Sequence, residues 1–241
     1  MNISLVSYLN SFPYHYGLLN ADDGLYSQLS IVPPAQCAKN FADSSSNVAL
    51  VPVGALNSLE NFQLIKPFCI SADGPVRSVL LVSNRPLQEI KHISPDSHSR
   101  SSNLLMKILC HNHWNIHPAF VKHDDASADA RIAIGDKAFE LQKNYKYSFD
   151  LSEAWKEMTG LPFVFAVWIT REDVNEEKLK GLKVALEAGI QDPAAAVRHF
   201  GSAGLSFDDA VSYLTDNINY RMNPAAEEGM KLYLTLAAKV L

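Results

Sequence analysis

Short β-rich runs alternate with helical patterns through the first sixty residues, and this alternation restricts the fold more than any other feature of the sequence. A β-α-β-α order implies a parallel sheet with right-handed crossovers, and such sheets bind ligands at the carboxyl ends of their strands. The residues directly after each strand are therefore the first candidates for a binding site. Strands are expected at 2–6, 29–32 and 47–51, and helices from Pro13, over 35–43 and from Pro52.

The rhythm of the pattern changes near residue 84. Two strand-like runs, 64–70 and 78–83, are joined by a polar turn, and a second α/β pattern leads from residue 86 to a very apolar strand at 163–170. Beyond that strand the pattern is helical to the end. We therefore predict an α/β fold of two lobes, with a ligand cleft between them and the helical tail packed on the first lobe. The predicted lobes are 1–84 with 166–241, and 85–165.

Composition excludes several classes of partner. Of the 241 residues, 47% are hydrophobic and 20% are charged, and the net charge is -5. Nucleic acids and anionic membrane surfaces require clustered cations, which this chain lacks. An acidic chain can still bind a small anion through local dipoles and one or two arginines. We expect a small-molecule substrate, no nucleic acid and no membrane, and a monomer or homodimer.

The expected location is the cytoplasm. The longest apolar stretch, 161–169, has about half the length of a membrane-spanning helix. The first residues contain no cationic segment followed by an apolar one, which a signal peptide requires. In such a reducing compartment we expect Cys37, Cys69 and Cys110 to stay reduced and to pack as small apolar side chains.

No metal and no cofactor are expected. Walker A, GxGxxG, GxSxG and HExxH motifs are missing from the sequence. Cys110, His113 and His117 would share one face of a continuous helix, as zinc ligands do. Asn115 and Pro118 indicate that the helix ends inside this segment, so the alternative is a group of solvated histidines at a helix end.

The first segment of polar residues that suits ligand binding follows the first predicted strand. It contains Tyr8, Asn10 and Ser11 directly before a helix. A hydroxyl, a phenol and a carboxamide beside a helix N-terminus are able to bind a polar ligand. The alternative is that Ser11 or Asn10 only caps the helix.

Two further segments precede predicted helices. Residues 97–102 supply serine hydroxyls, backbone N–H groups and an arginine able to make a bidentate contact, which suits a carboxylate or phosphate; the alternative is a solvated loop with one cap. At the end of a strand, Gly135 and Asp136 precede another helix, and Asp136 either binds a ligand hydroxyl or caps that helix. The apolar run 160–168 is either a buried strand or a pocket wall. The candidate residues of the first of these segments are Ser99, Arg100, Ser101 and Ser102.

Six stretches of the chain also occur together, in order, in one known family. They are VSYLNSFP (6–13), VALVPVGAL (48–56), SADGPVRSVLLVS (71–83), DSHSRSS (96–102), ARIAIGDKA (130–138) and DLSEAWKEMTGLPFVFAVW (150–168). In these stretches the chain resembles the menaquinone-biosynthesis chorismate dehydratases of the futalosine pathway. The resemblance implies a type II periplasmic-binding-protein-like fold and the removal of water from chorismate to give 3-[(1-carboxyvinyl)oxy]benzoate.

This resemblance also implies roles for particular residues. Ser78 and the loop 99–102 would hold carboxylates, and Asn10 would orient the ring hydroxyl or the enolpyruvyl group. The matched segments supply no obvious general base, because Asn10 cannot accept a proton. Similar to what is proposed for the family, the substrate's own enolpyruvyl carboxylate would take the proton from C3.

The chain departs from the family pattern at the serine-rich loop. It reads HSRSS at 98–102 where the family usually has SSRTS, so His98 replaces a small hydroxyl and Ser101 replaces threonine. The role of His98 is open. Two alternatives share the expected fold: a non-catalytic small-anion binding protein, and the sister enzyme 1,4-dihydroxy-6-naphthoate synthase. The latter family opens with a Pro-Asn-Asp run in its first turn, which this chain lacks.

Overall fold

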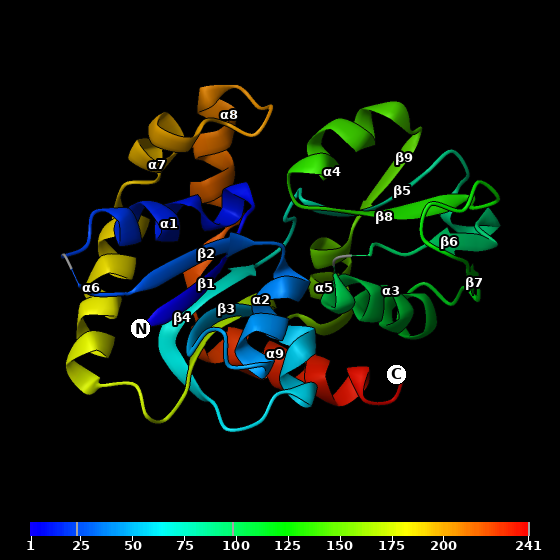
Figure 1. Ribbon diagram of the computed structural model, residues 1–241. Helices are drawn as coiled ribbons and strands as arrows, with labels where there is room; N and C mark the ends of the chain where they lie inside the picture. Colours follow the sequence, from blue (N-terminus) through cyan, green and yellow to red (C-terminus); the bar gives the residue numbers. More distant parts are fainter. Residues whose placement is uncertain (23, 98, 241) are drawn as a thin grey trace.

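Two α/β lobes lie side by side in the computed structural model, which describes residues 1–22, 24–97 and 99–240 (Figure 1). The first sheet contains the predicted parallel strands. β1 (Asn2–Val6) lies between β2 (Gln28–Val32) and β3 (Val48–Pro52) and runs parallel to both. All residues of β3 are buried, as expected of an apolar strand covered on both faces.

Antiparallel strands extend this first sheet. β10 (Phe163–Thr170) pairs with β3 and with β4 (Gln63–Ala72), and β11 (Asn219–Arg221) pairs with the outer edge of β4. The prediction of an entirely helical tail after residue 170 is therefore wrong at β11. Three residues are too few to show a period of two in the sequence, and it is pairing with β4 that makes this segment a strand.

The helices that cover the first sheet come from both ends of the chain. α1 packs closely on α6: a Cβ on Gly17 would lie 2.0 Å from the carbonyl oxygen of Ala185, and one on Gly189 would lie 1.9 Å from that of Pro13. Glycine is required where two helix backbones touch in this way. The predicted packing of the tail on the first lobe is confirmed. The helices concerned are α1 (Phe12–Leu19), α2 (Pro34–Ala42), α6 (Glu176–Gln191), α7 (Pro193–Phe200), α8 (Phe207–Ser212) and α9 (Pro224–Ala237).

The second sheet forms the core of the other lobe. Its strand order is β7-β6-β8-β5-β9, with β8 antiparallel to β5 and parallel to β6. The strands are β5 (Val79–Ser83), β6 (His92–Ser94), β7 (Ala119–Phe120), β8 (Ala130–Ile134) and β9 (Tyr147–Asp150), and the helices are α3 (Arg100–Asn112), α4 (Asp136–Leu141) and α5 (Leu151–Thr159).

The chain crosses between the sheets earlier than the predicted boundaries at residues 84 and 166. β5 pairs with β8 and β9, so it belongs to the second sheet although the prediction places it in the first lobe. β10 begins at Phe163 in the first sheet, so the return crossing precedes residue 166. A buried apolar run indicates a strand, but the sheet that it joins depends on partners distant in the sequence.

One carboxylate joins the first crossing to the start of α5. Asp150, at the end of β9, accepts hydrogen bonds from the backbone N–H of Arg77 at 2.6 Å, of Ser152 at 2.9 Å and of Glu153 at 3.2 Å. Burial raises the pKa of Asp150, and these backbone donors oppose the rise. Asp150 thus caps α5 and fixes the first crossing with one side chain.

Candidate active site

A cavity lies between the lobes, at the edge of the first sheet where its parallel strands end. Its empty space is about 530 Å³ when the open solvent at its mouth is counted, and about 60 Å³ of that space can hold the centre of a water molecule. It is lined by residues after β1, at the end of β3, at the start of β5 and in the first turn of α3. The position agrees with the expectation of a ligand cleft between the lobes.

The described lining of this cavity contains hydroxyls, an amide and apolar groups, and no ionisable acid, base or cation other than one phenol. A carboxylate or phosphate bound here would therefore meet neutral donors and helix dipoles. The polar lining residues are Tyr8, Asn10, Ser78, Ser99, Ser101 and Ser102, and the apolar ones include Val6, Pro52, Ile70, Val76, Ile134, Phe165 and Ala166.

Asn10 lies in the tight turn Leu9–Ser11, between β1 and α1. Its backbone carbonyl accepts a hydrogen bond from the hydroxyl of Tyr220 at 2.9 Å, which holds the turn against β11. The side-chain Oδ1 is buried and has no partner within the described part of the protein. Buried polar atoms are rarely left without a partner, so this oxygen is a group that a ligand is expected to satisfy.

Ser78 lies directly before β5 and is buried. Its Oγ is 2.8 Å from the phenol oxygen of Tyr213, in the tail of the chain. Burial raises the pKa of Tyr213 far above its usual value, and hydrogen bonding with the side chains of Ser78 and Asn10 opposes the rise. The two residues expected to be catalytic are therefore brought together, and they meet through a tyrosine that sequence reasoning missed. Tyr213 follows α8 in a helical pattern that nothing local distinguishes from the rest of the tail.

Tyr8 covers Gly135 from across the cleft. A Cβ on Gly135 would lie 2.8 Å from the Tyr8 ring, and its φ of +60° is one that glycine adopts without strain. Burial, followed by the charges of Asp96 and Asp136, raises the pKa of Tyr8 to about 12. Tyr8 is thus a neutral phenol at physiological pH, able to donate a hydrogen bond to a ligand.

The serine-rich loop leads into α3, which begins at Arg100. The Ser99 hydroxyl accepts from the N–H of Ser102 at 3.1 Å and lies 2.8 Å from the Ser102 hydroxyl, so Ser99 is the N-cap. The hydroxyl of Ser101 accepts from the N–H of Gly54 at 2.8 Å, across the cleft. The Tyr233 hydroxyl donates to the carbonyl of Ser101 at 3.0 Å. This wall therefore presents the N-terminus of a helix, with two hydroxyls engaged in holding it.

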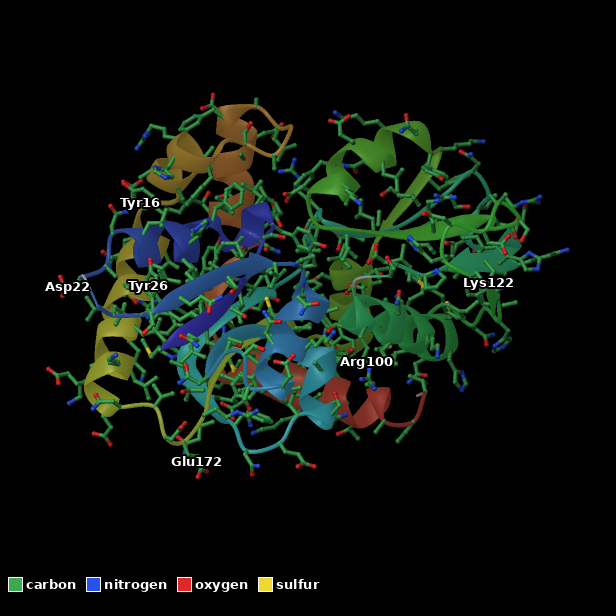
Figure 2. The ribbon with its side chains drawn as sticks, in the orientation of Figure 1. Tyr16, Asp22, Tyr26, Arg100, Lys122 and Glu172 are labelled. Carbon is green, nitrogen blue, oxygen red and sulfur yellow. The ribbon has the colours of Figure 1, made fainter. Side chains whose placement is uncertain are left out.

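Three predicted site residues lie outside the cavity lining. Ser11 is buried and donates to the carbonyls of Val6 and Tyr8, so it stabilises the turn. Arg100 is exposed, and its guanidinium lies 3.4 Å from the Ser58 hydroxyl (Figure 2).

Asp136 accepts a hydrogen bond from the N–H of Leu9 at 2.9 Å and thereby links the lobes. Burial raises the pKa of Asp136, and that hydrogen bond opposes the rise. His98 lies outside the described residues.

The histidine-rich segment after α3 is not a metal cluster. α3 ends at Asn112, and His113 lies 3.2 Å from Glu157 on α5. Over 1–22, 24–97 and 99–240, no group of three or more His, Cys, Asp or Glu side chains is arranged to hold a metal ion. In the same ranges, no helix is both long and apolar enough to cross a membrane.

Comparisons with known sequences point to one family. The model of a family described as menaquinone biosynthesis matches residues 1–239. A chorismate dehydratase of Campylobacter jejuni subsp. jejuni is 26% identical over 169 residues, which cover 68% of this chain. The match spans 64% of the length of that relative.

Solved structures that are similar to this one share its fold. A protein of Archaeoglobus fulgidus matches with a TM-score of 0.80 at 17% identity, covering 99% of this chain and 97% of its own. A Candida albicans protein, described as having the generic periplasmic binding protein fold, matches with 0.67 at 14% identity over 100% and 90% of the two chains. The aliphatic sulphonate binding protein of Escherichia coli matches with 0.64 at 14% identity over 100% and 92%. The expected periplasmic-binding-protein-like fold is confirmed.

Proposed function

Since this chain belongs to the menaquinone biosynthesis family, we propose that it is a chorismate dehydratase, which removes water from chorismate and forms 3-[(1-carboxyvinyl)oxy]benzoate. The name of the Campylobacter relative supports this activity. The main structural support for the proposal is the described lining of the cavity. It offers hydrogen-bonding groups and no residue that titrates near neutral pH. Such a lining suits a substrate that brings its own charges and its own base.

Chorismate carries two carboxylates and a ring hydroxyl, and the two walls of the cavity match them. The N-terminus of α3 offers backbone N–H groups and a partial positive charge to one carboxylate. Ser78, which precedes β5, donates to the other carboxylate. The unpartnered Oδ1 of Asn10 accepts from the ring hydroxyl.

The reaction is a redox-neutral elimination. The proton on C3 of chorismate is acidic because the resulting charge delocalises through the ring double bond onto the ring carboxylate. The enolpyruvyl carboxylate takes this proton, the C3–H electron pair forms the C3–C4 double bond, and the C4–O bond breaks. The departing hydroxide takes the proton from the enolpyruvyl carboxyl group and leaves as water. The ring becomes aromatic, which supplies the driving force.

In this scheme the protein positions the substrate and stabilises the charge that develops on it. Ser78 donates to the carboxylate on which charge develops, which is stabilisation of the oxyanion type. Asn10 holds the C4 hydroxyl so that its bond to the ring is aligned for departure. Tyr8 and Gly135 close the far side of the cleft over the ring. The buried and free thiols of Cys37, Cys69 and Cys110 support action in a reducing compartment such as the cytoplasm.

The test is incubation of the purified protein with chorismate, without added metal or nucleotide, followed by proton NMR. We expect the cyclohexadiene signals to be replaced by those of a meta-substituted aromatic ring. Chorismate that stays intact while it saturates the protein would assign the cavity to a small-anion binding protein. Loss of chorismate without the meta-substituted product would also reject the dehydratase.

A further inference from the structure

Tyr213 occupies the junction of the two lobes although it belongs to the tail of the chain. It begins the π-helical turn Tyr213–Asn217 that follows α8, and its side chain is buried. Its ring packs edge-on against Phe139 of α4 in the other lobe, with ring centroids 5.1 Å apart and an interplanar angle of 83°. A π-turn inside a helix is uncommon and recurs at functional sites.

Two side chains meet this phenol from opposite ends of the chain. The Oγ of Ser78 is 2.8 Å from the phenol oxygen, and either of these two oxygens can donate. The side chain of Asn10 lowers the pKa of Tyr213 through a hydrogen bond, and because its Oδ1 has no partner in the described residues, the amide N–H is the group that can donate. A phenol that accepts from Asn10 and donates to Ser78 would use its own proton and direct the proton of the Ser78 hydroxyl away from Tyr213.

We propose that Tyr213 is a positioning residue of the dehydratase, which fixes the donor and acceptor directions of Asn10 and Ser78. The series runs from the Asn10 amide N–H to the Tyr213 oxygen, and from the Tyr213 O–H to the Ser78 oxygen. Its two ends, the Oδ1 of Asn10 and the O–H of Ser78, are the groups offered to the substrate. The inference rests on the proposed function, because the substrate groups that it serves are those of chorismate.

The arrangement has a clear chemical use. A free asparagine amide turns by half a rotation at little cost, and a free serine hydroxyl rotates among its staggered positions. Held by Tyr213, Asn10 presents only an acceptor to the substrate hydroxyl and Ser78 presents only a donor to its carboxylate. The residue thereby removes arrangements in which either group faces the substrate with the wrong polarity.

The test compares Tyr213→Phe with Tyr14→Phe. Tyr14 is also a buried tyrosine of the first lobe, and its hydroxyl bonds to the backbone carbonyls of Cys69 and Tyr220. We expect Tyr213→Phe to lower kcat about tenfold with KM little changed, the effect of one lost buried hydrogen bond on the reacting state. Tyr14→Phe keeps the parent kcat. Equal kcat values for the parent and Tyr213→Phe would overturn the proposal.

A second comparison separates positioning from a merely structural role. If Tyr213 acts through Ser78, its loss matters less once the Ser78 hydroxyl is gone. We therefore expect Tyr213→Phe to lower kcat much less in a Ser78→Ala background than in the parent. The same factor in both backgrounds would show that Tyr213 acts independently of Ser78 and would overturn the proposed series.

A measurement on the protein without substrate tests the role of Tyr213 separately from the proposed function. In nitrogen-15 labelled protein, the side-chain amide protons of Asn10, assigned through Asn10→Asp, should exchange slowly with solvent. Tyr213→Phe should speed that exchange and shift the resonance, whereas Tyr14→Phe should not. An unchanged Asn10 amide would overturn the inference, whatever the turnover. A parent protein that leaves chorismate intact would reject the dehydratase, and the amide signal would still decide the role of Tyr213.

Discussion

The two walls of the cavity both carry serines, yet they offer a ligand different things. On the wall that carries Asn10 and Ser78, with Tyr213 behind it, the proposed series leaves one acceptor and one hydroxyl proton for a substrate. On the wall formed by the start of α3, Ser99 caps the helix and Ser101 holds the backbone of Gly54. Here the free groups belong to the backbone, and the hydroxyls serve the structure.

This difference shows that the number of hydroxyls at a site is a poor guide to its chemistry. The Ser101 hydroxyl holds a backbone N–H of another segment, so its loss is expected to disturb the backbone. The Ser78 hydroxyl is paired with a side chain, that of Tyr213, so its loss is expected to leave the backbone in place. We therefore expect substitutions on the first wall to change the chemical step, and substitutions on the second to change stability and substrate affinity.

The largest effects are expected on the first wall. Asn10→Ala and Ser78→Ala should each lower kcat by on the order of 10²-fold if each side chain contacts developing charge or the departing hydroxyl. Steady-state kinetics by proton NMR gives kcat and KM, and circular dichroism shows that the fold is retained. Variants that turn chorismate over at the parent rate would remove both residues from the mechanism.

The contact between the second wall and the first lobe gives the next largest effect. A Cβ on Gly54 would lie 2.9 Å from the Cα and Oγ of Ser101 and 3.0 Å from the hydroxyl of Tyr233. Gly54→Ala should push α3 outward, cost about 1–3 kcal/mol of stability and raise KM more than it lowers kcat. Gly74→Ala is the control, because a Cβ there meets nothing within 4 Å although its φ of +119° is strained. A larger KM effect for the control would contradict the contact.

Ser101→Ala tests the structural role of a hydroxyl directly. Its loss leaves the buried N–H of Gly54 without its partner, which costs about 1–3 kcal/mol of unfolding free energy. Because Ser101 donates nothing essential to the chemical step in this scheme, kcat of the folded variant should stay near that of the parent. Urea unfolding and kcat measured on the same preparation decide the matter. A fall in kcat like that of Ser78→Ala would erase the distinction between the walls.

Local pattern was enough for most of the secondary structure and for several residues that line the cavity. β1, β2 and β3, with α1 and α2, are at their predicted places within one or two residues, because strand and helix periods are local properties. Asn10 and Gly135 could be found because residues after the strands of an α/β sheet meet at one edge. Ser78 precedes its strand, and it was the family resemblance that singled it out.

What sequence reasoning missed depends on contacts between distant segments. The sheet that β5 joins is set by β8 and β9, and β11 is a strand because β4 pairs with it. Arg100 was expected to bind an anion, but the helix that it begins turns its guanidinium toward Ser58. Tyr213 is 135 residues from Ser78 in the sequence, so no local motif could join them.

A smaller effect is expected for Asp136→Asn, and it concerns how stability depends on pH. Burial raises its pKa in the folded protein, so ionisation costs stability as the pH rises through the unfolded value of about 3.9 toward the folded one. Asp136→Asn keeps an acceptor for the N–H of Leu9 and does not ionise. Its unfolding temperature relative to the parent should therefore increase from about pH 4 to neutral pH.

The control for Asp136 is a carboxylate with the opposite shift. Hydrogen bonds from Ser45 lower the pKa of the exposed Asp43, so Asp43→Asn should lose stability relative to the parent as the pH rises. Thermal unfolding of both variants across this range distinguishes the two directions. A relative stability of Asp136→Asn that falls with rising pH would show that the lobe contact requires the ionised carboxylate.

The smallest effect is expected at Arg100, where the sequence pattern and the structure disagree most. If its guanidinium bound a substrate carboxylate in a bidentate manner, Arg100→Ala would raise KM strongly, because a charge-assisted pair contributes about 1.5–3 kcal/mol. In the structure it is exposed and makes one long contact with Ser58, so its removal should change stability by less than about 0.5 kcal/mol. KM should stay near the parent value, because the second wall binds through the neutral N-terminus of α3. A raised KM that Arg100→Lys fails to restore would instead show that the arginine turns into the cleft when substrate binds, and the second wall would then contribute a charge as well as a dipole.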